Sequence, residues 1–230
     1  MCSKRIIDAP DSVTRDAITK AAARQFAKHG IVDTTIRDIV REAGISLGTI
    51  NYHFGSKLGL AHEVYERVVW EACEERNAAY DALEAAAGDK PVAVEAIFRT
   101  LFKPYMEGDE DRRLLLIHIL QQHHLARLEM AREIGRKYLD QVAIRTIAML
   151  RTACPHLSAR EVAWRYSLCI IGVLGAVSDG CADNRIKRLS NGAADSSDRA
   201  QLIEQTIKFA VDVFERAPDA KADTTPRRRR

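Results

Sequence analysis

The chain has 230 residues, of which 47% are hydrophobic and 6% aromatic, and its formal net charge is +3. This composition is normal for a soluble protein with a sizeable core, and its many Ala, Leu, Ile, Arg and Glu residues favour helix over sheet. The five cysteines are an odd number with no C-x-x-C pair, which excludes a disulfide framework and a zinc knuckle and indicates reduced thiols.

Charge is spread unevenly along the chain. Residues 1–57 hold nine Lys and Arg against six Asp and Glu, and residues 218–230 hold five against two, so the middle is net acidic. Positive ends suit a protein that touches a polyanion with one part only; the alternative is a chance distribution over a solvated surface. The N-terminus lacks a signal-peptide core and the most apolar run, 168–177, is too short to span a bilayer, which predicts a cytoplasmic protein.

Capping residues and apolar spacing predict two helices in the first 43 residues. Asp11 or Ser12 is expected to cap the first helix, which should end near Gly30, and residues 1–10 look frayed. Thr35 is expected to cap the second, with Asp38 three residues later as its capping-box partner.

A tight turn and two more helices follow. Gly44 permits the sharp turn, and Ser46 is expected to cap a very short third helix that ends near Tyr52. A long helix should start at Ser56 and run to the region 85–88. Further helical patterns cover about 91–107, 110–126, 128–153, 158–181 and 196–216, with a loop at 182–195. The sequence therefore predicts an all-α protein of about nine helices.

The second and third helices have the layout of a helix-turn-helix that enters the major groove of DNA. The start of the third helix, Leu47-Gly48-Thr49, is compact enough for close approach. Thr49 can reach base edges or a thymine methyl group, Leu47 can touch the same methyl, and Asn51 can pair with adenine if it faces the groove. The alternative interpretation is a purely structural three-helix unit.

Phosphate ligands are expected around this helix. Thr35 lies at a helix N-terminus, where free N–H groups favour an anion, and such contacts fix register without reading sequence. The predicted DNA-contacting residues are Thr35, Arg37, Ser46, Leu47, Gly48, Thr49, Asn51, Tyr52, His53 and Lys57, with Arg41 as a further backbone contact.

The joint pattern resembles the N-terminal domain of the TetR family of bacterial transcriptional regulators, over roughly residues 12–65. The matching features are the Ala-Ala, Phe26 and Gly30 of the first helix, Thr34-Thr35-x-x-x-Ile39, Ala43-Gly44-Ile45-Ser46-x-Gly48-Thr49-Ile50-x-Tyr52-His53-Phe54, and Ser56-Lys57. Gly59 departs from the pattern, because the family usually has Glu there, so the capping box expected from Ser56 is missing.

The resemblance implies three helices for DNA and about six for ligand binding and dimerisation. It also implies a regulator, mostly a repressor, that binds a palindromic operator as a dimer or a pair of dimers. A small molecule in the large domain would move the helix that follows the DNA-binding domain, separate the two DNA-binding domains of the dimer and release DNA. The count of nine helices, obtained from periodicity and caps, agrees with this.

A mostly apolar cavity with a few polar anchors would suit a small organic effector. The residues expected to line it are Trp70, Cys73, Phe98, Phe102, Tyr105, His118, Gln122, Tyr138, Gln141, Arg145, Trp164 and Cys169. Arg145 or a histidine could meet a carboxylate, so the mixture favours an aromatic or acyl carboxylate. The alternative is that these aromatic residues are plain core.

The last two long helices look interfacial. The run 168–177 is apolar on every side, so it must be covered on every side, and the final helix offers a broad apolar stripe. Two helices from each of two subunits would form a four-helix interface in a homodimer; the alternative is burial of both helices within a monomer.

Other functions have little support. His118, His123 and His124 are spaced five and six apart and do not share a helix face, so no metal is expected. No nucleophile elbow, Walker loop, HExxH or Rossmann glycines occur, so neither an enzyme nor a cofactor is expected. The Arg227–Arg230 tail could add sequence-independent DNA affinity, but a disordered end suits it better.

These observations predict a DNA-binding domain over residues 1–55, a ligand-binding and dimerisation domain over 56–217 and a basic tail over 218–230. The expected function is a transcriptional repressor that a small organic effector releases from double-stranded operator DNA. A ligand-independent regulator or an activator is the alternative.

Overall fold

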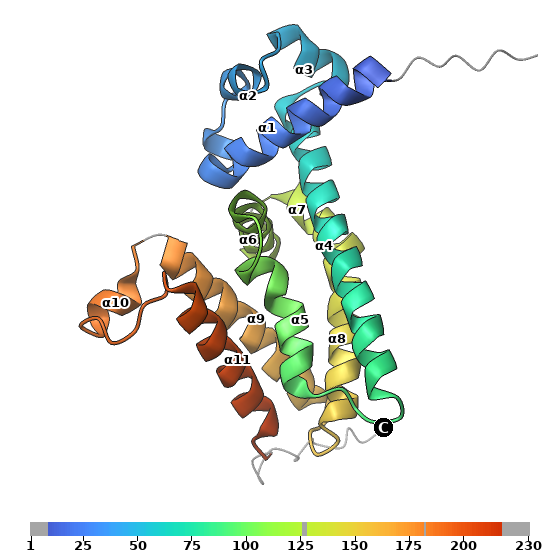
Figure 1. Ribbon diagram of the computed structural model, residues 1–230, viewed down its shortest axis with the longest axis vertical. Coiled ribbons are helices and arrows are strands. Elements are labelled where there is room, and N and C mark those ends of the chain that lie inside the picture. The colour runs from blue at the N-terminus through green and yellow to red at the C-terminus, as the bar shows by residue number, and fades with distance from the viewer. Residues whose placement is uncertain (1–8, 126–127, 182, 218–230) are drawn as a thin grey trace, which may run out of the picture. The chain divides into compact units, whose positions relative to one another are not determined.

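The computed structural model describes residues 9–125, 128–181 and 183–217, and all regular structure in these residues is helical (Figure 1). The predicted frayed end falls mostly on residues 1–8 and the basic tail on 218–230, both outside the described residues. The chain divides into two compact units, Met1–Glu75 with Glu107–Asp140 and Arg76–Met106 with Gln141–Arg230, here called unit 1 and unit 2.

Unit 1 contains the first helices of the chain. Helix α1 (Ala9–Asp33) packs against α2 (Ile36–Ala43) and, most extensively, against α6 (Glu110–Leu125); α3 (Leu47–Phe54) follows α2. Its core includes the fully buried side chains of Ile39 and Ile50, and Phe26 meets Tyr65 of α4 edge-to-face at a centroid distance of 6.4 Å. The all-helical fold is confirmed.

Helix α1 begins at Ala9, so the predicted caps Asp11 and Ser12 are wrong; both residues lie inside the first turns. Its predicted end is confirmed, because Gly30 leaves helical geometry with φ 71° and ψ 170°. Only glycine adopts such dihedrals without steric cost. A short continuation to Asp33 then leads into α2.

Helix α4 (Lys57–Ala87) is the long helix that the sequence predicts, and it contributes residues to both units. Ser56 caps it, since the Ser56 hydroxyl accepts a hydrogen bond from the Gly59 backbone N–H at 3.0 Å. It ends at Gly88, which is left-handed with φ 59°. The predicted start and end are both confirmed within one residue.

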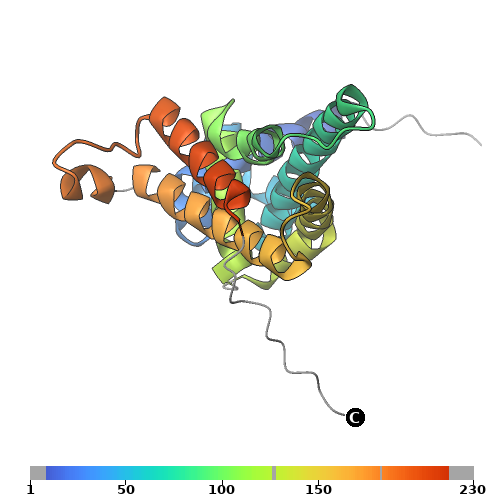
Figure 2. The same ribbon diagram turned by 90° about the horizontal axis from the view of Figure 1, so that it is seen from below.

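Unit 2 is built around three helices, α5 (Val94–Met106), α9 (Ala159–Cys181) and α11 (Arg199–Glu215). Helix α11 packs on both α5 and α9, and α9 and α11 run side by side in both views (Figure 2). Phe98 lies 5.4 Å from Phe102 and 5.3 Å from Phe214 between ring centroids, which places an aromatic cluster in this core.

Two predicted segments differ from the structure. The single helix expected at 128–153 is α7 (Glu129–Ile134), a π-helical segment η1 (Gly135–Leu139) and α8 (Asp140–Ala153) in succession. The loop expected at 182–195 contains a short helix, α10 (Arg185–Leu189). Both differences depend on residues outside the segment concerned, His123 for η1 and Asp179 for α10.

Candidate nucleic-acid interface and ligand sites

The corner between α2 and α3 has the predicted geometry. The Thr35 hydroxyl accepts a hydrogen bond from the Asp38 backbone N–H at 3.2 Å, and the Asp38 carboxylate accepts one from the Thr35 N–H at 3.2 Å, which completes the capping box. Gly44 is left-handed with φ 67° and ψ 33°, so the chain turns at once into α3. The turn residues therefore fix the angle between the two helices.

Ser46 is the N-cap of α3, but its side chain makes no capping hydrogen bond, and this part of the prediction is wrong. Its hydroxyl lies instead 2.9 Å from the Thr49 hydroxyl. Only one of the two hydroxyls donates in this contact, so the other keeps its O–H donor for a base or a phosphate.

The outer surface of α3 is open to solvent. Leu47 is 51% exposed and Tyr52 is 80% exposed, while Ser46, Gly48 and Asn51 are also exposed. Thr49 and His53 are half-buried. A large aromatic ring with so little cover on the chain itself is available to a partner surface.

The charged side chains next to Thr35, those of Asp38 and Arg41, already form an ion pair within the chain. The Asp38 carboxylate accepts hydrogen bonds from the Thr35 side chain and from Arg41 Nη2, while Arg37 is exposed. The hydrogen bonds from the Thr35 side chain and backbone, followed by the Arg41 charge, lower the pKa of Asp38. A phosphate at this helix end would compete with a fixed carboxylate for the same groups.

Lys57 has an internal use that the sequence did not suggest. Its Nζ donates hydrogen bonds to the carbonyl oxygens of Ile31 at 2.8 Å, Val32 at 3.2 Å and Thr34 at 2.9 Å. An ammonium group has three N–H donors, and here all three face carbonyls at the end of α1. Lys57 thus positions the α1–α2 connection, and a phosphate contact from it stays a prediction.

Arg15 is a positioning residue that sequence reasoning missed. Its guanidinium donates to Glu63 of α4 at 3.0 Å and to the His53 carbonyl at 3.0 Å, and it lies 4.6 Å from the centre of the Phe54 ring. Arg15 therefore ties α1 to the end of α3 and to α4. No local sequence pattern indicates this role of Arg15, because its partners are 38 and 48 residues away in sequence.

Gly59 is explained by the backbone around it. A Cβ atom at this position would lie 2.2 Å from the Phe54 carbonyl oxygen, so a side chain does not fit without a shift of the backbone. The glycine that departs from the family pattern thus permits a tight junction between α3 and α4.

The predicted effector-binding residues are divided between the two units. Those in unit 1 are Trp70, Cys73, His118, Gln122 and Tyr138, and those in unit 2 are Phe98, Phe102, Tyr105, Gln141, Arg145, Trp164 and Cys169. Phe98, Phe102, Tyr105, Cys73 and Cys169 are buried, while Trp70 and Trp164 are 48% and 61% exposed. Their joint role in one site stays a prediction.

Polar members of this set have specific partners. Arg145 pairs with Asp81 and Glu84, both at 2.6 Å, which occupies the group expected to meet a carboxylate. The Tyr138 hydroxyl donates to Glu66 at 2.9 Å. The His118 imidazole contacts the Phe26 carbonyl through Nδ1 at 3.3 Å.

Unit 1 contains a cavity of about 740 Å³ between the end of α1, the start of α4 and α6. His118 and Gln122 are the two predicted effector-binding residues that line it. Trp70 and Tyr138 line a smaller hollow of about 270 Å³ with Glu63, Glu66 and Arg67.

Unit 2 contains an apolar groove of about 690 Å³ between α9, α10 and α11. Its lining includes Gly172 and Gly175 of α9, Ile186 of α10, and Leu202 and Phe209 of α11. A Cβ atom added at either glycine would meet no atom within 4 Å, so the floor of the groove is open.

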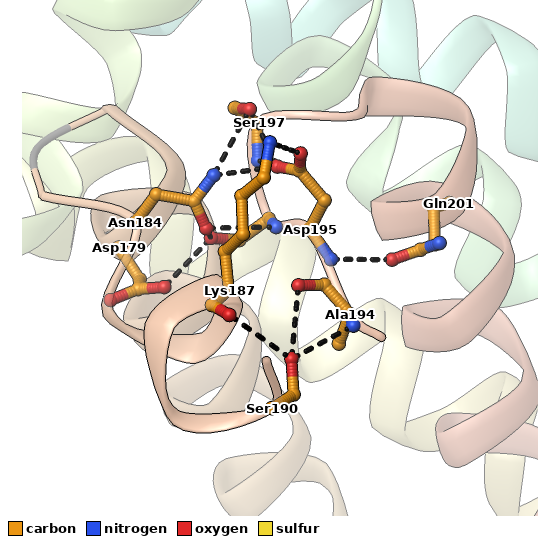
Figure 3. A network of polar contacts seen from close by, with 9 residues as sticks. Asp179, Asn184, Lys187, Ser190, Ala194, Asp195, Ser197 and Gln201 are labelled. Carbon is orange, nitrogen blue, oxygen red and sulfur yellow. Dashed lines mark hydrogen bonds and ion pairs between the residues drawn. The ribbon is translucent and has the colours of Figure 1, made fainter. Parts of the chain in front are cut away.

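Helix α10 is held by a dense polar network (Figure 3). The Asp179 carboxylate accepts hydrogen bonds from the backbone N–H groups of Arg185 at 2.9 Å and Ile186 at 3.1 Å, which caps the helix. Asp195 accepts from Lys187 Nζ at 2.6 Å and from Asn184 Nδ2 at 2.5 Å. This segment is therefore fixed to the end of α9, with the apolar side chain of Leu189 67% exposed.

Two family models match the chain. One, described as bacterial regulatory proteins of the tetR family, covers residues 18–64, and the other, described as the tetracyclin repressor-like C-terminal domain, covers residues 95–211. The second match alone spans half of the chain, and the first contains α2, α3 and the start of α4.

Curated relatives agree with these matches. The chain is 28% identical over 153 residues to the transcriptional regulator BetI of Agrobacterium fabrum, which covers 66% of this chain and 71% of BetI. It is 38% identical over 52 residues to a probable acrEF/envCD operon repressor of Escherichia coli, covering 23% and 24% of the two chains.

Solved structures share the fold. A transcriptional regulator from Saccharomonospora viridis in complex with choline is 22% identical, with a TM-score of 0.58 over 87% of this chain and 95% of that one. A TetR-like regulator from a Rhodococcus species is 18% identical, with a TM-score of 0.53 over 88% and 96%.

Proposed function

The chain belongs to the TetR family of bacterial transcriptional regulators, and from this premise we propose that it is a repressor released from a palindromic operator by a small organic effector. Membership makes it a soluble, DNA-binding regulator and not an enzyme. The repressor action, the palindrome and the effector are the proposed part, as is its place in the cytoplasm.

The exposed surface of α3 carries this proposal. Leu47 and Tyr52 project into solvent from a helix whose entry angle is fixed by Gly44, and Thr49 lies between them in sequence. A short helix with compact residues at its start can enter the major groove, where the hydroxyl of Thr49 and the apolar edge of Leu47 would read bases. Arg37 and Tyr52 would contact phosphates on either side.

A homodimer is the proposed form that reads a palindrome. Helix α9 is the one helix among the described residues that is long and apolar enough to cross a membrane by length and composition, with a mean hydropathy of 1.3, yet only 33% of that window is buried within the chain. Because the helix belongs to the regulatory domain of a soluble family, we attribute its uncovered apolar surface to a second copy of the chain.

The apolar surface continues onto the neighbouring helices. Leu168 and Ile171 on α9 are 60% and 50% exposed, and Phe209 on α11 is 52% exposed. The open glycines of the groove would admit a partner helix at close range, and α10 would extend the contact through Ile186 and Leu189. These residues form the proposed dimer surface.

The decisive experiment is selection of random duplexes by the purified chain, followed by affinity measurements for the winners at two salt concentrations. We expect a palindrome whose half-sites lie one or more helical turns apart. Recovery of no motif, with binding that vanishes as salt rises, would leave only the sequence-independent electrostatic attraction and would exclude a specific operator for the free protein.

A further inference from the structure

The cavity in unit 1 has the properties of a ligand site that directly adjoins the DNA-reading helices. Its volume of about 740 Å³ lies within the range of small-molecule pockets. All its walls belong to one compact unit, since they come from the end of α1, the start of α4, α6 and Leu128 just before α7.

The walls include apolar side chains that nothing else in the described chain covers well. Val32 and Leu58 line the cavity and are 87% and 56% exposed, while Tyr65 and Ile31, which also line it, are buried. Exposed apolar groups around a hollow of this size favour an occupant with an apolar body.

The charged groups of the cavity are mostly basic. Lys28, His29 and Lys57 line it together with a single carboxylate, that of Asp33. His118 adds an imidazole whose Nδ1 faces the Phe26 carbonyl, which leaves its Nε2 for another partner. An amphipathic occupant therefore gains from a negative head group, whereas a quaternary ammonium would meet like charge.

Lys57 connects the cavity to the DNA-reading corner. Lys57 lines the cavity, and its ammonium group holds the carbonyls of Ile31, Val32 and Thr34. A hydrogen bond to a carboxylate is stronger than one to a neutral carbonyl, so a carboxylate ligand would draw Lys57 away from the end of α1. The connection that leads into Thr35 and α2 would then lose its support.

We propose that this cavity binds a small amphipathic carboxylate, and that binding loosens the α1–α2 connection and weakens DNA binding. The effect on DNA depends on the proposed function, whereas the binding site itself does not. The site differs from the one expected from the sequence, since it combines His118 and Gln122 with residues of α1 and α4.

The test compares three probes on the full chain by titration calorimetry: decanoate, decyltrimethylammonium, which has the same tail with a cationic head, and choline. We expect decanoate to bind at a single site and at least about tenfold more tightly than either cation. Tighter binding of decyltrimethylammonium or choline, or no binding of decanoate, would overturn the proposal.

Two variants locate the site. Leu58→Trp fills the cavity, and Lys28→Gln with His29→Gln removes basic groups from its wall; each should weaken decanoate binding about tenfold or more. Ile144→Trp is the matched control, because Ile144 is a 69% exposed apolar residue on α8 in unit 2. If decanoate binds all these variants as it binds the original chain, its site lies elsewhere and the proposal is wrong.

Duplex affinity, measured with and without decanoate, separates this proposal from the proposed function. At equilibrium decanoate should weaken duplex binding by the same factor by which duplex weakens decanoate binding. Specific duplex binding without decanoate binding would refute the site and leave the regulator intact. Decanoate binding that depends on Leu58, in a protein that selects no duplex, would refute the operator and leave the site intact.

Discussion

Two glycines in adjacent helices illustrate opposite reasons for lacking a side chain. At Gly59 in the first turn of α4, a Cβ atom would lie 2.2 Å from the Phe54 carbonyl oxygen. At Gly48 in α3, the nearest atom would be the Ser46 hydroxyl at 3.9 Å, which is ordinary contact. Gly59 is therefore required by packing within the chain, whereas Gly48 is free of such a requirement.

We expect Gly59→Ala to lower the free energy of unfolding by ~1–3 kcal/mol, because the helix junction must shift to admit the methyl group. Gly48→Ala, the matched control, should raise it by ~0.5 kcal/mol, since alanine loses less backbone entropy in a helix. Urea unfolding of both variants checks the prediction. An equal rise in the free energy of unfolding in both would show that the Phe54 carbonyl oxygen does not exclude a side chain at position 59.

Thr49 and Tyr52 should affect DNA binding in different ways. Thr49→Ala is expected to change the selected base at one position of each half-site, with a loss of ~1–3 kcal/mol of discrimination there. Tyr52→Phe removes the hydroxyl of a proposed phosphate ligand and should weaken the binding of all sequences alike. Repeating the duplex selection with both variants checks this; a uniform loss from Thr49→Ala would mean that Thr49 does not read bases.

Residue-level prediction from sequence succeeded where the partner lies within one helical turn. The Thr35–Asp38 capping box and the left-handed Gly44 are both confirmed. It missed the internal contacts of Lys57 and Arg15, whose partners are distant in sequence. Which of several acceptors a long basic side chain selects depends on where the fold brings them.

The π-helical segment η1 depends on a contact between two elements. A Cβ atom on Gly135 would lie 2.1 Å from Nδ1 of His123, so the imidazole of α6 occupies the place of a side chain at the start of η1. No interaction within the segment 128–153 indicates this, which is why the sequence predicted one uninterrupted helix there. Helix α10 was missed for a similar reason, because its cap is Asp179 of α9.

His123 should make the stability of this region dependent on pH. Burial, opposed in part by Asp140, lowers the pKa of His123 below its usual 6.5. As the pH falls, His123 is therefore protonated in the unfolded chain before it is protonated in the folded one. The contribution of His123 to the free energy of unfolding is complete above about pH 7 and decreases as the pH drops below 6.5. His123→Phe, with a ring of similar shape, should reduce the fall of the thermal unfolding midpoint between pH 7.5 and 5.5. If the midpoint falls equally in both proteins, the pH dependence comes from other groups.

On the scale of the whole molecule, the two compact units do not follow the predicted domain boundary at residue 55, because unit 1 combines the DNA-reading helices with α6 and α7. The matched families cover 18–64 and 95–211, and most of α4 lies between them. The order of the long helices was predictable from apolar periodicity, but the division of the segment 128–153 and helix α10 were not. The grouping of helices was not, because it depends on contacts such as that between α1 and α6.

Dimerisation should depend on the exposed apolar surface of α9. Leu168→Glu with Ile171→Glu places two charges on that surface and should shift the chain to a monomer with a large loss of affinity for the palindrome. Ile144→Glu on α8 is the control, because it adds a charge at an equally exposed apolar position outside the proposed dimer surface. Sedimentation equilibrium checks both, and a dimer that survives the double substitution would refute the proposed surface.

The way α10 is anchored bears on which subunits pair. The segment is fixed to its own chain at both ends. Asp179 caps its start. At its other end, the Ser196 carbonyl oxygen lies 2.1 Å from the position that a Cβ atom on Gly180 would take. Ile186 and Leu189 are 45% and 67% exposed, so their side chains can change without disturbing α9. A bacterium that holds several related repressors must prevent mixed pairs, which would read hybrid operators. If α10 lies in the dimer surface, it gives each paralogue a separately variable recognition element that keeps their regulatory circuits insulated from one another.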